Sequence, residues 1–331
     1  MSTIMKTRHP ESRRPDQVEL SIVVPIYNEL PVLPNLYARL RNVLDPLEIH
    51  YELVLIDDGS RDGSGDYLLQ LATTTSVVKA VRLSRNFGKE AALTAGLEHA
   101  SGDAVIILDA DLQDPPELIP QMLAAFYGGS DIICMKRRSR AGESWAKRLS
   151  AYLFYRLLNR ISSIEIPRDT GDFRLMSRRV INALRLLPER NRYMKGLFAW
   201  VGFPTLVIEY DREARAAGTT KWNVLGLFGL AFEGFTSFSV APLRWATGIG
   251  FLAALIGATF GLWIVVKTLL LGNAVEGYPS LIAMITFMGG IQLLSIGMVG
   301  EYVGKTYFET KQRPLYVIQD VVKSPATVAR T

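Results

Sequence analysis

The first half of the chain alternates short apolar runs with stretches of helical periodicity. The apolar runs predict buried strands at residues 20–27, 51–56, 77–83, 104–108 and 131–135. Between them, the pattern predicts helices at residues 30–44, 65–72, 91–100 and 116–127. Strands and helices that alternate at this spacing are typical of a mostly parallel sheet with both faces covered. The predicted fold class is therefore α/β.

Two long runs without a charged residue fill most of the last third of the chain. They extend from Trp245 to Val266 and from Tyr278 to Gly300. Each run exceeds the ~20 residues that a helix needs to cross a bilayer, whereas a buried core helix of that length normally shows one polar face. We therefore expect a hairpin of two transmembrane helices within residues 244–307.

The charges that flank this hairpin predict its orientation. Arg244 precedes the first run, Lys305 and Arg313 follow the second, and the connecting loop carries only Glu276. By the positive-inside rule, the first half of the chain is expected in the cytoplasm, as part of a multi-pass protein of the plasma (inner) membrane. Gly289-Gly290 in the second run allows close helix packing, either within the hairpin or between the protomers of a homo-oligomer.

The other segments differ in composition from these two parts. Residues 1–17 are polar and lack the apolar stretch of a signal peptide, which predicts a disordered tail. Residues 18–221 form the predicted α/β domain. Residues 222–243 are rich in aromatic side chains and predict an interfacial segment, with core packing as the alternative. Residues 308–331 are expected to be a cytoplasmic C-terminal tail. The weakly amphipathic pattern at residues 145–161 fits a helix on the membrane surface or one packed in the domain.

The composition narrows the classes of function. The chain is 49% hydrophobic and carries a formal net charge of +5. In a protein with membrane helices, anionic lipids and phosphorylated substrates explain a basic charge as well as a nucleic acid would, and we expect no nucleic-acid partner. The single cysteine, Cys134, excludes an intramolecular disulfide, and the scattered histidines make no zinc-type spacing.

Polar clusters follow four of the predicted strands at the points where the strands end. They are Tyr27-Asn28-Glu29, Asp57-Asp58, Ser84-Arg85-Asn86 and Asp109-Ala110-Asp111. Ligands of open α/β sheets bind outside the carboxyl ends of the strands, so this coincidence favours a binding site over chance. Asp109 and Asp111 can reach one divalent cation, and their hard oxygen ligands favour Mg²⁺ or Mn²⁺, which can in turn hold a substrate diphosphate.

The ordered set of motifs resembles a known family. The motifs are Val24-Pro25-Ile26-Tyr27-Asn28-Glu29, Asp57-Asp58-Gly59-Ser60, Asn86-Phe87-Gly88-Lys89, Asp109 to Pro116, and Thr170-Gly171-Asp172-Phe173-Arg174-Leu175. They are similar to those of the family 2 glycosyltransferases of GT-A fold, and more narrowly to the polyprenyl-phosphate glycosyltransferases. The two-span end of the chain resembles the bactoprenol glucosyltransferase branch best. The resemblance covers roughly residues 20–320 and implies a Rossmann-like GT-A catalytic domain followed by the transmembrane hairpin.

The resemblance also implies an activity. It points to a membrane-anchored inverting enzyme that moves one sugar from a nucleotide-sugar donor to a polyprenyl phosphate at the cytoplasmic face, with Mg²⁺ or Mn²⁺ as cofactor. UDP-glucose and undecaprenyl phosphate are the favoured pair, while GDP-mannose or a UDP-amino-sugar is the alternative donor. A non-catalytic membrane scaffold on the same fold is the rival from another class, and the intact acidic pair counts against it.

Residues that match the family's motifs take their roles from the resemblance. The implied metal ligands are Asp109, Asp111 and Gln113. The implied nucleotide-sugar contacts are Pro25, Tyr27, Asn28, Glu29, Asp57, Asp58, Arg85, Asn86, Gly88, Lys89, Asp109, Ala110, Arg215 and Lys221. The implied catalytic residues are Asp172, Asp111 and Arg137. The basic run around Arg137, Arg138 and Arg140 is expected to bind the acceptor phosphate, unless it is only a solvated or headgroup-binding stretch.

Elementary chemistry supports most of these roles. A nucleoside diphosphate is a poor leaving group until its charge is neutralised, which a bound cation together with Arg and Lys side chains can achieve. The acceptor is a lipid monophosphate whose second pKa is near ~6, so its oxygen is largely ionised at pH 7. It needs little help from a general base, and we therefore expect Asp172 to orient or tune the site rather than to abstract a proton.

Overall fold

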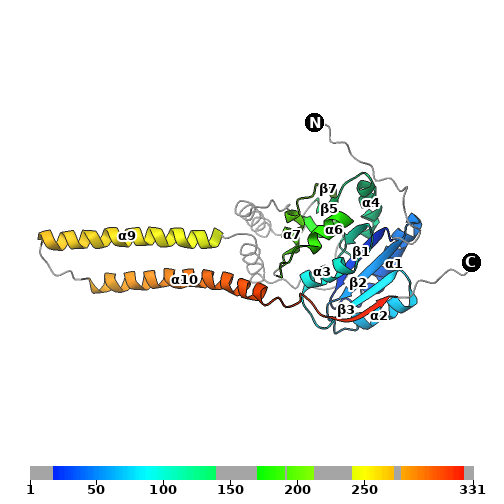
Figure 1. The fold of residues 1–331 in the computed structure, drawn as a ribbon, viewed down its shortest axis with the longest axis horizontal. Helices are drawn as coiled ribbons and strands as arrows, with labels where there is room; N and C mark the ends of the chain where they lie inside the picture. The colour runs from blue at the N-terminus through cyan, green and yellow to red at the C-terminus, as the bar shows by residue number, and fades with distance from the viewer. Residues whose placement is uncertain (1–17, 139–169, 191, 212–240, 272–276, 324–331) are drawn as a thin grey trace, which may run out of the picture. The chain divides into compact units, whose positions relative to one another are not determined.

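The structure, a computed structural model, describes residues 18–138, 170–190, 192–211, 241–271 and 277–323. The chain divides into two compact units, and each is described by itself. Of the described residues, those up to 211 and residues 314–323 belong to an α/β unit, while residues 241–313 belong to a helical unit. The α/β unit is therefore interrupted in sequence by the helical unit and resumes after it (Figure 1).

Eight strands of the described residues form one sheet at the centre of the α/β unit, with the strand order β7-β5-β6-β4-β1-β2-β3-β8. The strands are β1 (Leu20–Ile26), β2 (Tyr51–Asp57), β3 (Val78–Leu83), β4 (Ala104–Ile107), β5 (Ile132–Arg137), β6 (Thr170–Ser177), β7 (Thr205–Tyr210) and β8 (Ile318–Lys323). Strands β4, β1, β2 and β3 run parallel, as do β5 and β7, whereas β6 and β8 run antiparallel to their neighbours. The predicted α/β class and the strands expected in the first half of the chain are confirmed.

Helices pack on both faces of this sheet. They are α1 (Leu33–Leu44), α2 (Ser64–Thr74), α3 (Lys89–His99), α4 (Ile119–Tyr127), α6 (Arg178–Arg185) and α7 (Met194–Trp200), with short 3-10 helices η1 (Asp45–Leu47) and η2 (Pro116–Leu118). Helices α1, α2 and α4 share a core with the side chains of Ile22 and Val24. Because alternate strand residues point to opposite faces, Val23 faces the other way. There α3 comes so close that a Cβ added to Gly96 would lie 2.2 Å from Val23 Cγ1.

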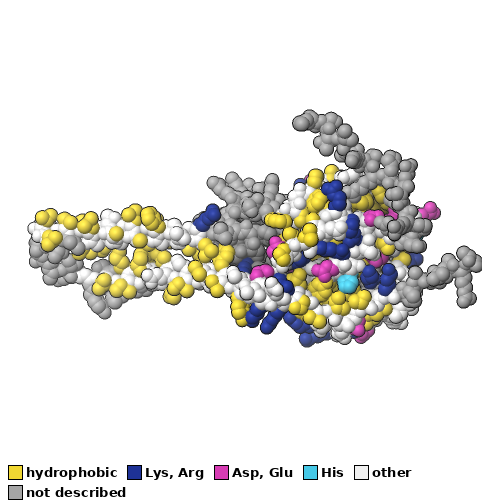
Figure 2. All heavy atoms as spheres, viewed as in Figure 1, with side chains coloured by type: hydrophobic (Ala, Val, Ile, Leu, Met, Phe, Trp, Pro, Cys, Tyr) yellow, Lys and Arg dark blue, Asp and Glu magenta, His cyan; other side chains and the backbone are white. Residues whose placement is uncertain are grey.

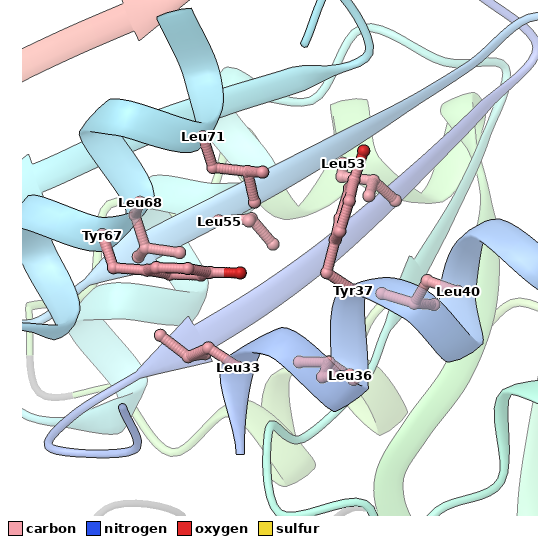
Figure 3. A pocket seen from close by; sticks show the side chains of 9 residues that line it. All are labelled: Leu33, Leu36, Tyr37, Leu40, Leu53, Leu55, Tyr67, Leu68 and Leu71. Carbon is pink, nitrogen blue, oxygen red and sulfur yellow. The ribbon is translucent and has the colours of Figure 1, made fainter. Parts of the chain in front are cut away.

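Side chains fill nearly all of the space between α1, α2 and β2. Figure 3 shows apolar side chains from all three elements, among them Leu33, Leu68 and Leu53, converging around one small space. Its free volume is about 10 Å³ and its walls are almost entirely apolar. Such a space is at the lower limit for one water molecule, and a water there would find few polar partners. It is a packing gap in the core and not a ligand site.

Strand β6 was not predicted, because the sequence between residues 145 and 210 gives only a mixed pattern. The structure inserts β6 between β4 and β5, antiparallel to both. Phe173 and Leu175 of β6 are fully buried, while the charged Arg174 between them is also buried, with its guanidinium 4.1 Å from the ring centre of Phe198 in α7. A strand that buries a charged residue on one face loses the clean alternation by which strands are found.

Strand β8 departs from the C-terminal tail expected at residues 308–331. It pairs antiparallel with β3, from Lys79 opposite Lys323 to Leu83 opposite Ile318, and it forms one edge of the sheet. Most of its residues are exposed, so β8 lacks the apolar run that marks a buried strand. The sheet is completed only after the chain has passed through the helical unit.

The described part of the helical unit contains α9 (Ala241–Leu271) and α10 (Tyr278–Thr310), which pack side by side and antiparallel (Figure 1). Apolar side chains lie on the surface along both helices (Figure 2). Phe251, for example, is 72% exposed, and Leu293 is also 72% exposed. Such a surface is typical of a protein face that contacts another apolar phase. A Cβ at Gly289 or Gly290 would meet nothing within 4 Å among the described residues, so these glycines do not serve close packing of the hairpin there.

Within the part of the chain that the structure describes, one helical segment is long and apolar enough to cross a membrane, judged by length and composition alone. It is Ala246–Ile264 in α9, and α10 does not pass the same test over its described residues. The predicted two-span hairpin is therefore supported in its first helix, and its second span remains a prediction. The predictions for residues 1–17, for the helix at 145–161 and for most of the interfacial segment 222–243 fall outside the described residues.

Candidate active site

A cavity of about 300 Å³ opens at the carboxyl ends of the parallel strands. The predicted site residues that line it are Pro25, Tyr27, Glu29, Asp58, Asn86, Gly88, Lys89, Asp109, Ala110 and Asp111. They come from the ends of β1, β2 and β4 and from the loop between β3 and α3. Parallel strands bring their carboxyl ends to one edge of the sheet, which is why residues far apart in the sequence meet here.

The loop after β1 is fixed by polar contacts with the loop after β2. Asn28 has a positive φ of 55°. Its backbone N–H donates to Ser60 Oγ at 2.9 Å, and its side-chain Oδ1 accepts from Arg61 N at 2.8 Å. Asn28 lies outside the lining of the cavity. Its part in the site is to hold the turn that presents Tyr27 and Glu29.

The two acids after β2 have different surroundings. Asp57 is 1% exposed, accepts a hydrogen bond from Ser60 N at 2.9 Å, and lies 3.4 Å from the Arg82 guanidinium. Asp58 accepts from the backbone N–H groups of Phe87 at 2.7 Å and Gly88 at 3.0 Å. Burial raises the pKa of Asp58 despite those hydrogen bonds. Asp58 lines the cavity and shapes the turn before α3, whereas Asp57 is enclosed beneath it.

Lys89, the first residue of α3, joins two carboxylates from different strands. Its Nζ lies 2.7 Å from Asp109 Oδ1 and 2.6 Å from Asp172 Oδ2. Burial works against the charged lysine, but the two carboxylates raise the pKa of Lys89 above its ordinary value. Burial likewise opposes ionisation of Asp172, yet Lys89 and Lys195 lower the pKa of Asp172 well below its usual range. Both groups are therefore charged at neutral pH.

Glu90 is an acidic residue of this region that no sequence motif marks. Burial, and the nearby charge of Asp172, raise the pKa of Glu90 to about 7. Its Oε2 accepts a hydrogen bond from Met194 N at 3.3 Å, which ties the start of α3 to the start of α7. No local pattern could have marked Glu90, because its burial depends on α7, a helix that follows a hundred residues later in the chain.

The carboxylate oxygens of Asp109 and Asp111 are suitable ligands for a divalent cation. Asp109 and Asp111 both line the cavity, and Mg²⁺ is commonly held by one or two carboxylates together with substrate phosphates. Within the described residues no group of three or more His, Cys, Asp or Glu side chains gathers for a metal, so substrate and solvent oxygens would complete the coordination. Gln113 lies outside the cavity lining. Its backbone N–H donates a hydrogen bond to Asp111 Oδ1 at 3.2 Å.

The predicted phosphate-binding residues are only partly described. Arg137 ends β5, is half-buried and lies beside Tyr210, with which it is in register. Arg138 is exposed and forms an ion pair with Asp211 at 3.2 Å. Neither lines the 300 Å³ cavity. Arg140, Arg215 and Lys221 lie outside the described residues.

Arg85 belongs to a second cavity beside the first. Its guanidinium donates to Asn86 O at 3.0 Å and lies 4.1 Å from the ring centre of Phe87. The second cavity has a volume of about 200 Å³ and shares the side chains of Tyr27 and Asn86 with the first. The two spaces are therefore neighbours along one edge of the sheet.

Comparison with known proteins agrees with this geometry. The model of glycosyl transferase family 2 matches residues 21–185. The uncharacterised glycosyltransferase sll0501 of Synechocystis sp. is 49% identical over 304 residues, which cover 92% of this chain and 96% of that protein. A prophage bactoprenol glucosyl transferase homolog of Escherichia coli K12 is 46% identical over 306 residues, which cover 92% of this chain and 100% of that protein.

The chain therefore belongs to glycosyltransferase family 2. Within that family it groups with the bactoprenol glucosyl transferases, which it matches over nearly its whole length, and the predicted family is confirmed. Among solved structures, that of Staphylococcus aureus TarS 1–349 is similar over 59% of each chain, with 16% identity and a TM-score of 0.43. That likeness is too distant to bear on the chemistry.

Proposed function

We propose that this glycosyltransferase transfers a single sugar, glucose from UDP-glucose, to a polyprenyl phosphate such as undecaprenyl phosphate at the cytoplasmic face of the membrane. The observation that carries the proposal is the cavity lined by Asp109, Asp111 and Lys89, in which Lys89 Nζ lies 2.7 Å from Asp109 Oδ1. That arrangement suits a nucleoside diphosphate, because carboxylates can hold a divalent cation and the ammonium adds positive charge. The name of the E. coli relative, a bactoprenol glucosyl transferase homolog, supports the choice of sugar and lipid.

The chemistry requires one bond to form and one to break. An oxygen of the lipid phosphate attacks the anomeric carbon, and the bond from that carbon to the diphosphate breaks, so that the nucleoside diphosphate leaves with the electron pair. The attacking oxygen is already ionised at pH 7, so no side chain has to remove a proton. Attack opposite the leaving group inverts the anomeric centre.

The residues of this chain act mainly through charge. Asp109 and Asp111 would hold Mg²⁺ or Mn²⁺, which when bound supplies positive charge to the diphosphate. Lys89 adds a positive charge on the same cavity wall, and its ion pair with Asp172 at 2.6 Å is proposed to hold the lysine in place. Arg137 and Arg138, with Arg140, are proposed to meet the acceptor phosphate. Arg215 and Lys221 are proposed to meet the donor diphosphate.

The helical unit supports a lipid acceptor. Ala246–Ile264 is long and apolar enough to cross a bilayer, and both α9 and α10 expose large apolar side chains. A polyprenyl tail lies in hydrocarbon while its phosphate lies at the interface. Anchoring the enzyme to the same membrane raises the effective concentration of that phosphate at the active site. We propose that α10 also spans the membrane, and that both ends of the hairpin face the cytoplasm.

The test is transfer of labelled sugar into lipid. Purified protein in detergent is incubated with Mn²⁺, undecaprenyl phosphate and labelled UDP-glucose, and in parallel with UDP-N-acetylglucosamine or GDP-mannose. Label that enters the organic phase with UDP-glucose, and only when lipid is present, supports the proposal. If label enters the lipid only from another donor, that donor's sugar takes the place of glucose in the proposal. No label from any donor contradicts transferase activity and favours a membrane scaffold.

A further inference from the structure

Strand β8 places one side chain beside the donor cavity by means of an irregularity in its pairing. Leu83 of β3 lies opposite Ile318, but the next residue back, Arg82, lies opposite Asp320. Gln319 is therefore an extra residue on β8, the mark of a β-bulge. Bulges occur often beside active sites, where they re-aim a side chain that regular pairing would direct elsewhere.

Gln319 lines the second cavity, which has a volume of about 200 Å³. The rest of the wall comes from the end of β3, with Arg82 and Leu83, and from the loops after β1, β2 and β3, including Tyr27, Ser60 and Asn86. Tyr27 and Asn86 also line the donor cavity, so the second cavity continues the first in the direction away from the acidic pair. A nucleoside diphosphate whose phosphates lie at Asp109 and Asp111 would extend its base into this space.

The walls of the second cavity are held firmly. A Cβ added to Gly59 would lie 2.4 Å from the carbonyl carbon of Arg85, so the loops after β2 and β3 are in close backbone contact. Gly59 also has a positive φ of 68°, which favours glycine. Ser84 N donates to Val317 O at 2.9 Å, which fastens β8 to the same loop. The cavity is thus preorganised, and β8 is part of its frame.

Asp57 and Asp58, which the family resemblance implies as nucleotide-sugar contacts, already accept hydrogen bonds from backbone N–H groups. Asp57 is enclosed and bonded to Ser60 N, and both oxygens of Asp58 accept backbone N–H groups. A carboxamide is a better match for a uracil edge, because it offers one N–H donor and one oxygen acceptor to adjacent C=O and N–H groups of the base. Tyr27, with 37% of its surface exposed, offers an aromatic ring near the same space.

We infer that Gln319, carried on the strand that follows the helical unit, positions the nucleobase of the donor in the second cavity. The inference rests on the proposed function, because it assumes a uridine nucleotide donor. It adds a residue that lies far outside residues 21–185, where the family model matches. The donor site is then incomplete until the end of the chain has returned from the helical unit to the sheet.

The test compares a ligand that has a base with one that lacks it. Binding of UDP and of inorganic diphosphate, each with Mn²⁺, is measured by calorimetry on the full-length protein in detergent. Gln319→Ala should weaken UDP binding about 3- to 10-fold, the effect of one or two lost hydrogen bonds, and leave diphosphate binding unchanged. Gln319→Glu, similar in size but without the N–H donor, should weaken UDP binding at least as much.

Val321→Ala is the matched control, since Val321 lies two residues further along β8, is 47% exposed and is absent from the cavity wall. It should bind UDP like the unaltered protein. Unchanged UDP binding in Gln319→Ala, or an equal loss for UDP and diphosphate, overturns the inference while leaving the proposed function intact. Failure of the unaltered protein to bind UDP instead removes the uridine donor on which the inference rests.

Discussion

Lys89 Nζ lies 2.6 Å from Asp172 Oδ2, and of these two residues only the lysine lines the donor cavity. We therefore propose that Asp172 acts on the substrate through Lys89. The pKa of Asp172 is held below its usual range although burial opposes this, because Lys89 and Lys195 lie close to it. A carboxylate of such low basicity is a poor proton acceptor, which agrees with an acceptor phosphate that is already ionised.

The first prediction is that Asp172→Asn reduces kcat about 10-fold and leaves the pH dependence of kcat/KM unchanged between pH 6 and 9. The expected loss reflects a lysine that is less well positioned, since the amide still accepts a hydrogen bond but carries no charge. The measurement is steady-state transfer over that pH range. A loss of several orders of magnitude at every pH would instead identify Asp172 as an indispensable base.

The second prediction concerns competition between Lys89 and the metal. The ammonium lies 2.7 Å from Asp109 Oδ1, so its charge opposes binding of a cation by the same carboxylate. Lys89→Gln should therefore bind Mn²⁺ about 5-fold more tightly in the absence of donor, by the loss of that repulsion, and should nevertheless transfer sugar more slowly. Free Mn²⁺ is measured by electron paramagnetic resonance.

Lys136→Gln provides the control for this measurement. Lys136 forms an ion pair with Glu209 at 2.9 Å and lies outside the cavity lining. Its replacement should leave Mn²⁺ binding as it is in the unaltered protein. Weaker Mn²⁺ binding in Lys89→Gln would show that the lysine supports the metal site and would contradict the proposed competition.

The third prediction separates two acids that lie three residues apart. Asp111 lines the cavity, whereas Asp114 is 2% exposed and accepts a hydrogen bond from the Tyr210 hydroxyl. Asp111→Asn should lower transfer more than about 100-fold without changing the melting temperature, because a neutral amide is a weak ligand for a divalent cation. Asp114→Asn should instead reduce the stability by about 1–3 kcal/mol, because it weakens a buried hydrogen bond to a charged group.

Transfer assays and thermal unfolding in the same detergent distinguish these outcomes. Near-normal transfer by Asp111→Asn at saturating Mn²⁺ would exclude Asp111 as a metal ligand. An unchanged melting temperature for Asp114→Asn would show that the bond to Tyr210 contributes little.

The sequence predicts the parts of this site that depend on local pattern. Asp109 and Asp111 follow a recognisable buried strand, and the rule that ligands bind at the carboxyl ends of parallel strands places them beside Lys89. Asp172 could be assigned only by resemblance, because its position depends on β6 entering the sheet between β4 and β5. Local propensity says nothing about that long-range pairing.

Other features depend on packing between distant segments and gave no signal in the sequence. Glu90 is buried because α7 lies over the start of α3. Gln319 belongs to an exposed edge strand without apolar alternation, and its bulge exists only in the pairing with β3. Asp57 and Asp58 look equivalent in the sequence, yet the fold encloses one and leaves the other on the cavity wall.

The fourth prediction concerns a buried carboxylate near the amino end of β2, at the opposite end of the strand from the site. Glu52 is 3% exposed and accepts hydrogen bonds from Ser21 Oγ at 2.7 Å and from Ser101 N at 2.6 Å. Burial acts to raise its pKa, but these bonds and the charge of Lys79 lower the pKa of Glu52 overall. The ionised form therefore stabilises the fold at pH values above the unfolded pKa, and this contribution is lost as the pH falls through the folded pKa.

Glu52→Gln should accordingly lower the free energy of unfolding at pH 7 by about 1–3 kcal/mol, the usual effect of weakening hydrogen bonds to a buried charged group. The difference from the unaltered protein should shrink as the pH falls below the ordinary value of 4.5, because the unfolded chain then binds a proton that the folded Glu52 does not yet take up. Thermal unfolding of both proteins at several pH values measures this difference in stability. A difference that stays constant down to pH 4 would mean that the charge of Glu52 contributes nothing to stability.

The fifth prediction concerns Glu90, whose pKa is raised in the folded protein, so that its effect on stability changes with pH in the opposite direction to that of Glu52. Burial and the charge of Asp172 raise the pKa of Glu90 to about 7, above the ordinary value of 4.5. Between these two pH values the folded protein holds a proton that the unfolded chain has released, so stability falls as the pH rises through this range. Above pH 7 the fold bears the full cost of an ionised Glu90, while below pH 4.5 the proton is bound in both states.

Glu90→Gln removes this titration and keeps an oxygen that can accept the hydrogen bond from Met194 N. Its melting temperature relative to the unaltered protein should therefore rise by several degrees from pH 5 to pH 8, whereas that of Glu52→Gln should not rise in this way. The contrast separates a buried acid whose charge is satisfied from one whose charge is not. A melting-temperature difference for Glu90→Gln that is the same at pH 5 and pH 8 would show that Glu90 is ionised in the folded protein across this range, and that Lys89 and Lys195 offset its burial.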